Sequence, residues 1–240
     1  FANILERIFE SNFEKNKIFN KAIDGVVFIQ PDTGKFIQGN YIDRIKDLDE
    51  IPSPYLNGML DKFFDGKLTP FIETNRGCPF TCSFCHTGSN YYHKLNKFSK
   101  DRVENEIEYI GKKAGKLKIS NLHMADVNFG MYPQDRLTCG FLKKSKEKYG
   151  WPKQIMATTG KNSKDRVMEI TNILGDMFSI NMSMQSMDEQ VLKNIKRANI
   201  KLDHMIDVNN HLIEQGRSTK AELIVGLPGE TKETFLNGLD

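Results

Sequence analysis

The chain has 240 residues, of which 39% are hydrophobic and 27% are charged, and its formal net charge is only +3. This is the composition of a globular protein with enough apolar material for a sizeable core. Basic residues are scattered among acidic ones, as in KKSKEKYGWPK, which disfavours a nucleic-acid-binding stripe. No apolar run approaches the about 20 residues of a membrane-spanning helix, and no signal peptide is visible.

The first 65 residues predict a short α+β segment followed by a linker. Residues 1–20 predict a short helix. GVVFIQPDTGKFIQ predicts two strands joined by a turn at 31–34. The next stretch, DRIKDLDEIPSPYL, is polar and interrupted by prolines, which is typical of a linker.

Strands and helices alternate from about residue 70 to the end of the chain. Strands are predicted in PFIETN, KISNLHMADVNF, QIMATTG, MFSINMSMQS and TKAELIVGLPGE. Helices are predicted from about residue 101, over 134–148 and 163–174, around 191–195, over 202–213 and from about residue 231. We expect Asp101 and Glu104 to form a capping box, and Leu137 and Phe141 to lie on one apolar stripe.

This alternation predicts an α/β fold with a parallel sheet covered by helices. The sheet is either a doubly wound open sheet or a (β/α) barrel, whole or partial. Ligands bind at the carboxyl ends of the strands in both arrangements. A cysteine-rich loop and the motifs ADVNFG, TTGKN, SMQS and GLPGE all fall at those ends.

The loop after the first of these strands, GCPFTCSFCH at 77–86, contains three of the four cysteines. Cys78, Cys82 and Cys85 form a C-x3-C-x2-C pattern. Such a cluster is typical of a metal site in a reducing compartment, here predicted to be the cytoplasm, rather than of a disulfide framework. Three thiolates would leave one iron of a four-iron cubane without a protein ligand, and an open coordination position invites a substrate or cofactor.

The residues alone leave other metal chemistries open. A structural Cys3His zinc site could use His86 or His93, but His86 adjoins Cys85, and adjacent residues of an extended loop point apart. Cys139 lies in the middle of a predicted helix, where we expect a small buried hydrophobic residue. An iron–sulfur electron-transfer protein and a zinc-stabilised α/β binding module are therefore alternatives to an enzyme.

The sequence resembles the radical S-adenosylmethionine (SAM) superfamily. The resemblance is carried by the cysteine motif with Phe84 before its last cysteine, and by NRGCPFTCSFC, MQSMDEQVLKNIKR and ELIVGLPGET. These segments are similar to radical SAM enzymes associated with a cobalamin-binding domain. The resemblance implies a partial (β/α)6-type barrel over 66–240, incomplete at its C-terminus. It also implies that 1–65 is the tail of an upstream cobalamin-binding-like domain with its linker, so that the chain is a fragment.

The resemblance also implies a chemistry. In this family three cysteines, here Cys78, Cys82 and Cys85, hold a [4Fe–4S] cluster that binds SAM and passes one electron to it. Cleavage gives methionine and a 5′-deoxyadenosyl radical, which abstracts hydrogen from a substrate. Cobalamin could act in the full-length protein, for instance in a methyltransferase. The expected partners are a small-molecule or biopolymer-precursor substrate and an electron donor such as flavodoxin or ferredoxin, with no nucleic acid and no membrane.

The SAM-binding residues are expected at the ends of the strands. In SINMSMQS the side chains of Asn181, Ser183 and Gln185 share a polar face that would point into a barrel. The resemblance assigns Ser183 and Gln185 to the ribose and carboxylate of SAM. Asp126 and Asn128 of ADVNFG stand where the family commonly has a GGE-like segment that touches the methionyl amino group.

The remaining candidates come from the last two strands and from loops. The resemblance places Arg197 near the SAM carboxylate, and Ile224 and Gly226 at the adenine. Glu222 needs a partner on its apolar strand, either Arg197 or a ligand hydroxyl. Phe84 is also expected to contact the cofactors, because it directly precedes the last cysteine of the motif. Loop residues expected near the substrate or over the site are Lys161 and Asn162 after the third strand, and Tyr91, Tyr92 and His93 beyond the cysteines.

Overall fold

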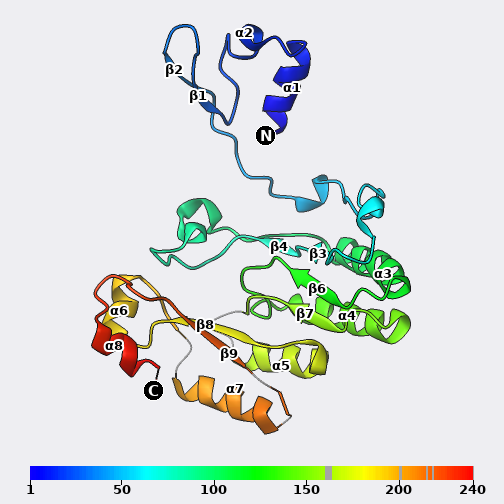
Figure 1. Ribbon diagram of the computed structural model, residues 1–240, viewed down its shortest axis with the longest axis vertical. Helices are drawn as coiled ribbons and strands as arrows, with labels where there is room; N and C mark the ends of the chain where they lie inside the picture. Colours follow the sequence, from blue (N-terminus) through cyan, green and yellow to red (C-terminus); the bar gives the residue numbers. More distant parts are fainter. Residues whose placement is uncertain (160–163, 200–201, 215, 218, 240) are drawn as a thin grey trace. The chain divides into compact units, whose positions relative to one another are not determined.

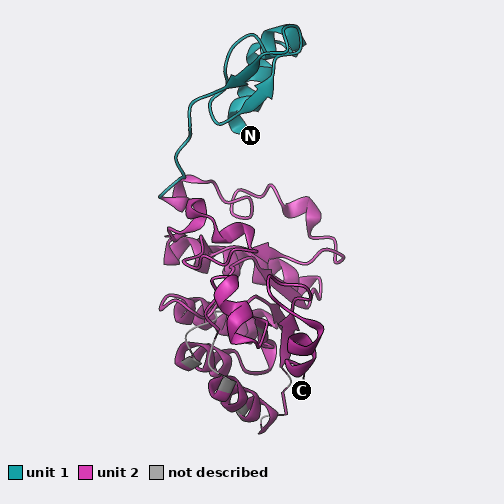
Figure 2. Cartoon of the chain, turned by 90° about the vertical axis from the view of Figure 1, so that its left-hand side faces the viewer, with its two compact units in different colours: residues 1–46 teal, residues 47–240 magenta. Residues whose placement is uncertain are grey.

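The structure is a computed structural model, and it describes residues 1–159, 164–199, 202–214, 216–217 and 219–239. The chain divides into two compact units, Phe1–Lys46 and Asp47–Asp240 (Figure 2). Residues 47–65 of the predicted linker therefore belong to the second unit. Within the described residues, no helix combines the length and the apolar character needed to cross a membrane.

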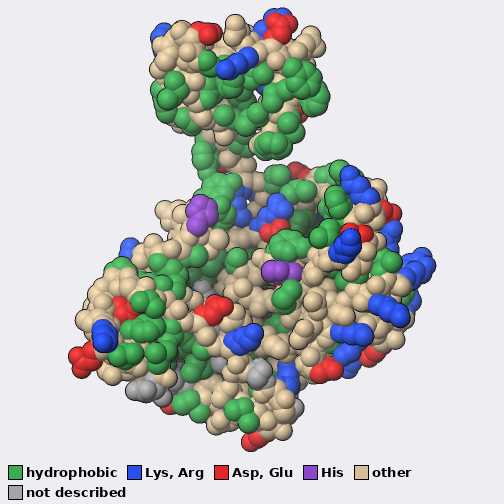
Figure 3. All heavy atoms as spheres, viewed as in Figure 1, with side chains coloured by type: hydrophobic (Ala, Val, Ile, Leu, Met, Phe, Trp, Pro, Cys, Tyr) green, Lys and Arg blue, Asp and Glu red, His purple; other side chains and the backbone are tan. Residues whose placement is uncertain are grey.

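The first unit contains two short helices and a hairpin. Its elements are α1 (Ala2–Glu10), α2 (Lys15–Ile18), β1 (Val27–Ile29) and β2 (Phe36–Gln38). β1 and β2 pair antiparallel, as the sequence predicts, with Val27 opposite Gln38. Ile23 is buried, whereas Phe9, Ile29 and Phe36 are more than half exposed. Hydrophobic side chains consequently cover much of the visible surface of this unit (Figure 3).

Parallel strands form the framework of the second unit (Figure 1). Its strands are β3 (Phe71–Ile72), β4 (Asn75–Arg76), β5 (Asn96–Lys97), β6 (Asn121–Met124), β7 (Gln154–Met156), β8 (Asn181–Gln185) and β9 (Lys220–Leu223). β3, β6 and β7 make one parallel sheet in that order, and β8 pairs parallel with β9. A parallel bridge between Ile155 and Phe178 joins β7 to the segment that leads into β8. The α/β class and the parallel pairing are confirmed, but the described strands form no closed barrel.

Helices separate the parallel strands along the chain. They are α3 (Lys100–Lys116), α4 (Asp135–Tyr149), α5 (Lys164–Leu174), α6 (Glu189–Asn194), α7 (Leu202–Glu214) and α8 (Lys232–Asn237). α4 contacts both α3 and α5, and α7 contacts α5. The main core lies between these helices and the strands. Its buried members include Ile72, Leu122 and Ile155 from the strands and Ile107, Leu142 and Ile170 from the helices.

Two local predictions are wrong for identifiable reasons. α3 begins at Lys100, and its N-cap is Ser99, whose hydroxyl accepts from the Arg102 N–H at 3.1 Å. Asp101 therefore lies inside the first turn and does not cap the helix. On α4, Leu137 is 49% exposed, while Cys139 and Leu142 are fully buried. The core-facing stripe of this helix combines small and polar residues with Leu142, so hydrophobicity alone did not locate it.

Candidate active site

The cysteine loop connects two short strands that pair with each other. β4 and β5 pair antiparallel, with Asn75 opposite Lys97, and so bring together the chain on either side of the loop. Inside, the Cys78 N–H donates to the Tyr92 carbonyl at 2.8 Å. Gly77 has φ +128°, and a Cβ there would lie 2.9 Å from the same Tyr92 carbonyl oxygen. Only glycine suits this position, because the backbone conformation and the close packing both exclude a side chain.

The loop places its three cysteines in one region of the second unit. None of the three is in a disulfide; Cys78 and Cys82 are buried, and Cys85 is half-buried. The Ser83 N–H donates to the Ile195 carbonyl at 2.9 Å, which ties the loop to the end of α6. No group of three or more His, Cys, Asp or Glu side chains among the described residues is close enough to hold a single metal ion. In a cubane, by contrast, each cysteine binds a separate iron.

Each of the three cysteine sulfurs of the loop lies near a polar atom of another side chain. Asn128 Nδ2 lies 3.3 Å from Cys78 Sγ, and Thr87 Oγ1 lies 3.1 Å from Cys85 Sγ. Arg197 Nη1 lies 3.9 Å from Cys82 Sγ. Three segments remote from one another, the loop itself, the end of β6 and the end of α6, therefore converge on the thiols.

Asp126 accepts hydrogen bonds from the chain that enters the cysteine loop. Its Oδ1 accepts from the Thr74 N–H at 3.1 Å, the Thr74 hydroxyl at 2.8 Å and the Asn75 N–H at 2.8 Å. These bonds connect the end of β6 to the chain that enters the cysteine loop. Burial raises the pKa of Asp126 to about 7, although the bonds from Thr74 and Asn75 oppose the rise. The predicted contact of this segment with SAM would then fall to its backbone.

Polar atoms without a partner gather near the ends of β3 and β6. They are Asn75 Oδ1, Asn128 Oδ1, Asp135 Oδ1 and Tyr132 OH, all buried. Burial raises the pKa of Asp135 to about 6 and that of Tyr132 to about 12. Because an unsatisfied buried polar atom costs free energy, such a group indicates a place where a ligand or water completes the hydrogen bonding.

β8 and β9 form a second polar group. Glu222 accepts from Asn181 Nδ2 at 2.6 Å and from Ser183 Oγ at 2.9 Å, and these two bonds lower the pKa of Glu222. The partners of Glu222 are thus on the neighbouring strand. Gln185 is buried at a β-bulge with φ +69°, and its carbonyl accepts from the Ile224 N–H at 2.8 Å.

Arg197, one of the two partners expected for Glu222, contacts the backbone of Ser183, whereas Glu222 accepts from the Ser183 and Asn181 side chains. The buried guanidinium of Arg197 donates to the Ser183 carbonyl and, at 2.6 Å, to Asn199 Oδ1. Burial lowers the pKa of Arg197, and the nearby cysteine thiolates oppose that effect. The structure therefore brings Arg197 to the cysteines and to β8.

The turn after β9 is held by Glu230. Its Oε2 accepts from the Gly226 N–H at 2.9 Å, and its Oε1 accepts from the Ser186 hydroxyl at 3.3 Å. Gly226 has φ +82°, and no atom lies within 4 Å of the position its Cβ would take. Ile224 packs against a small cluster formed by Val191, Ile195 and Leu227.

The other predicted residues lie on or outside the cysteine loop. Phe84 is exposed. His86 Nε2 lies 3.0 Å from the Tyr92 hydroxyl, and Tyr92 also packs edge-on against Tyr91. Lys161 and Asn162 fall outside the described residues. His93 is half-buried, and its Nε2 has no partner. Cys139 is fully buried on α4, as predicted, and burial raises the pKa of its thiol.

Sequence reasoning missed several residues of this region. Thr87 touches Cys85, Asn199 holds Arg197, and Glu230 links β8 to the turn after β9. Thr87 lies two positions after a cysteine, which is a local signal that could have found it. Asn199 likewise lies two positions after Arg197, whereas Glu230 reaches Ser186 across the fold and has no comparable signal.

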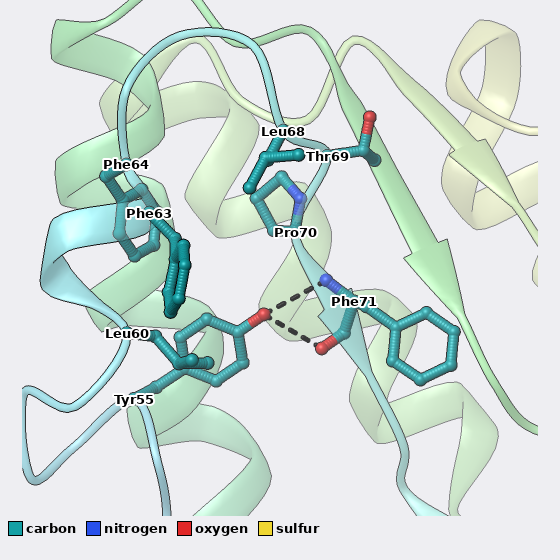
Figure 4. Close-up of a pocket in the computed structure, with 8 residues that line it drawn as sticks. All are labelled: Tyr55, Leu60, Phe63, Phe64, Leu68, Thr69, Pro70 and Phe71. Atoms are coloured by element: carbon teal, nitrogen blue, oxygen red, sulfur yellow. Dashed lines mark hydrogen bonds between the residues drawn. The ribbon is translucent and has the colours of Figure 1, made fainter.

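An apolar pocket of about 190 Å³ lies beside the start of β3 (Figure 4). It is lined by residues that precede or begin β3, including Leu68, Pro70 and Phe71. The Tyr55 hydroxyl donates to the Phe71 carbonyl at 2.9 Å at its edge. The cysteine loop follows the carboxyl end of β3, so this pocket is separate from the candidate site.

The second unit matches a known family. The model of the radical SAM superfamily matches residues 72–240. The chain is 34% identical over 212 residues to the cobalamin-dependent radical SAM methyltransferase TokK of Streptomyces tokunonensis. It is equally similar, over the same length, to the 2-(S-pantetheinyl)-carbapenam-3-carboxylate methyltransferase of Streptantibioticus cattleyicolor. Each alignment covers 85% of this chain but only 30% of the relative.

A solved structure supports the fold. The cobalamin-dependent SAM radical enzyme OxsB, with aqua-cobalamin and SAM bound, superposes with a TM-score of 0.68. The superposition covers 98% of this chain and 34% of OxsB, at 15% sequence identity. The chain belongs to the radical SAM superfamily, whose cofactors are a [4Fe–4S] cluster and SAM, and it is related to the cobalamin-dependent radical SAM methyltransferases.

Proposed function

We propose that the protein is a cobalamin-dependent radical SAM methyltransferase. The observation that carries the proposal is the cysteine loop, which places Cys78, Cys82 and Cys85 beside buried, unpartnered polar atoms at the strand ends. Two methyltransferases at 34% identity support the reaction class, and the name of one includes cobalamin. Family membership favours this function over an electron-transfer protein or a zinc-stabilised binding module.

The residues present fit the cluster and SAM. Cys78, Cys82 and Cys85 supply the three thiolates, and one iron is left for SAM. Asn75 Oδ1 and Asn128 Oδ1 are buried acceptors without partners, which suits the ammonium group of the methionyl moiety. When bound, the cluster and SAM supply one-electron reductive chemistry at the sulfonium, and cobalamin supplies a methyl carrier.

The last two strands would hold the rest of SAM. The Glu222 carboxylate, oriented by Asn181 and Ser183, can accept from the ribose hydroxyls. Arg197 is the cation for the methionyl carboxylate, and Gln185 adds a side-chain amide beside it. Gly226, with open space where a Cβ would be, admits the adenine next to Ile224. Phe84 would cover the cluster from the loop, and the backbone around Asp126 would face the amino group.

The broader assignments follow from the relatives. We place the strands of the second unit in a partial (β/α)6-type barrel that is completed in the whole protein. Residues 1–65 would be the tail of an upstream cobalamin-binding-like domain. A low-potential electron donor such as flavodoxin or ferredoxin would reduce the cluster in the cytoplasm, because radical SAM chemistry requires a reductant.

Labelled SAM tests this proposal. The whole protein, including the proposed upstream cobalamin-binding domain, is reconstituted anaerobically with iron and sulfide, then given dithionite, cobalamin and SAM with a labelled methyl group. We expect 5′-deoxyadenosine and labelled methylcobalamin from the wild type, and neither product from Cys82→Ala. Formation of 5′-deoxyadenosine without labelled methylcobalamin would refute the methyltransferase assignment alone. If the wild type consumes no SAM, the whole proposal is wrong.

A further inference from the structure

We infer that Thr87, Asn128 and Arg197 each donate a hydrogen bond to a different cluster thiolate and together raise the reduction potential of the [4Fe–4S] cluster. The inference rests on the proposed ligation by Cys78, Cys82 and Cys85. It adds to the ligands a set of side chains that tune them, with one donor for each sulfur.

Thr87, which lies within the loop, is the hydrogen-bond donor to Cys85. It lies in the short 3-10 turn His86–Gly88, and the Gly88 N–H donates to the Cys85 carbonyl at 2.9 Å. This turn brings Thr87 Oγ1 to 3.1 Å from Cys85 Sγ. Because a thiolate has no proton, the hydroxyl must be the donor when the cysteine binds iron.

Asn128, which follows β6, is the hydrogen-bond donor to Cys78. Its side chain is fully buried, with Nδ2 at 3.3 Å from Cys78 Sγ. The backbone around it is held firmly, since the Phe129 N–H donates to the Thr158 carbonyl at 2.9 Å and Phe129 is fully buried. The amide is therefore fixed in place before any cluster binds.

Arg197, in the segment after α6, is the hydrogen-bond donor to Cys82. Its guanidinium is held by the Ser183 carbonyl and by Asn199 Oδ1, which leaves Nη1 directed at Cys82 Sγ, 3.9 Å away. Asn199 is itself fixed, because its Nδ2 donates to the Met184 carbonyl at 2.7 Å. The buried positive charge of Arg197 is thus held close to the sulfur of Cys82.

The direction of the effect follows from charge. One electron from a low-potential donor gives the bound cluster one more negative charge, and no bond to protein forms or breaks. Hydrogen bonds and a positive charge at the sulfurs stabilise the more negative state, so they make reduction easier.

The test is an EPR-monitored redox titration of the reconstituted protein without SAM. Thr87→Val removes the hydroxyl at nearly constant shape, and Thr87→Ser keeps it. We expect the valine variant to lower the reduction equilibrium constant about tenfold, which is a negative shift of about 59 mV for one electron. The serine variant should stay close to the wild type. Thr87→Val with an unchanged potential, or Thr87→Ser with the same shift as valine, would overturn the role of Thr87.

Asn128→Leu provides a second, independent arm. Thr171→Val is the control, because Thr171 is also a fully buried polar residue, but its hydroxyl donates to the Val167 carbonyl within α5 and not to a sulfur. We expect a negative shift for Asn128→Leu and none for Thr171→Val. Equal potentials in Asn128→Leu and wild type, with four irons bound in both, would contradict the inference while leaving the proposed function intact. A wild type that binds no four-iron cluster would refute the proposed function itself.

Discussion

At the scale of single residues, the site is organised by side chains that hold other groups in place. Asp126 is the clearest case, because one carboxylate oxygen receives three hydrogen bonds from Thr74 and Asn75. The same carboxyl group is buried, so it carries a raised pKa of about 7. Its ionisation therefore affects the stability of the chain that enters the cysteine loop.

Asp126 should make the apoprotein less stable as the pH rises from about 4 to 7. In that window the folded carboxyl retains a proton that the unfolded one, with its usual pKa of 3.8, has released. The free energy of unfolding then falls by up to about 1.4 kcal/mol per pH unit from this group. Asp126→Asn keeps the Oδ1 acceptor and has no proton to release. Urea denaturation at several pH values should show a flatter pH dependence in the variant; an identical slope would contradict the assignment.

Residue-scale prediction from sequence succeeded where the signal is local. The burial of Cys139, expected from its place in the middle of a predicted helix, is confirmed, and the spacing of the other three cysteines marks them as predicted ligands. The partner of Glu222 was not predictable in this way. Asn181 and Ser183 reach it only because β8 pairs with β9 in a particular register, and register is a property of the folded sheet.

At the scale of elements, the close approach of α3 and α4 shapes the second unit. Gly111 of α3 faces the buried Ser145 of α4, and a Cβ at Gly111 would overlap Ser145 Oγ and lie 3.0 Å from Tyr149 Cδ2. Gly140 of α4 has no atom within 4 Å of the position of its Cβ. Two helical glycines thus differ in packing alone.

The pair Gly111→Ala and Gly140→Ala should change stability in opposite directions. Alanine favours a helix by about 1 kcal/mol over glycine, and at position 140 nothing opposes this gain. At position 111 the overlap with α4 should outweigh it and cost about 1–3 kcal/mol. Thermal or urea unfolding of the two variants measures the difference. A stabilised Gly111→Ala would show that α3 and α4 are not packed this closely.

The boundaries of elements were less predictable than their order. Strands were predicted where apolar residues alternate with a period of two, and helices where their period is near 3.6. α3 nevertheless starts at Lys100 with Ser99 as its cap, because the serine hydroxyl two residues before Asp101 accepts from the Arg102 N–H. The exposed Leu137 shows the same limit, since Thr138, Cys139 and Leu142 are the residues that α4 turns toward its neighbours.

At the scale of the whole molecule, the parallel strands bring remote motifs to one region. The loop after β3, the end of β6 and the segment after α6 meet at the cysteine sulfurs, although they are far apart in sequence. The alternation of elements predicted that such motifs would share the carboxyl ends of the strands. The closure of a barrel could not be predicted, because it depends on strand pairing across the whole fold rather than on local pattern.

The central claim is that Cys78, Cys82 and Cys85, without Cys139, hold a [4Fe–4S] cluster. The most direct test is the iron and sulfide content of the anaerobically reconstituted wild type, Cys82→Ala and Cys139→Ala proteins. We predict about four irons and four sulfides per chain in the wild type and in Cys139→Ala, because Cys139 is buried on α4. Cys82→Ala should bind no intact cluster. A full cluster in Cys82→Ala, or its loss in a folded Cys139→Ala, would contradict the claim.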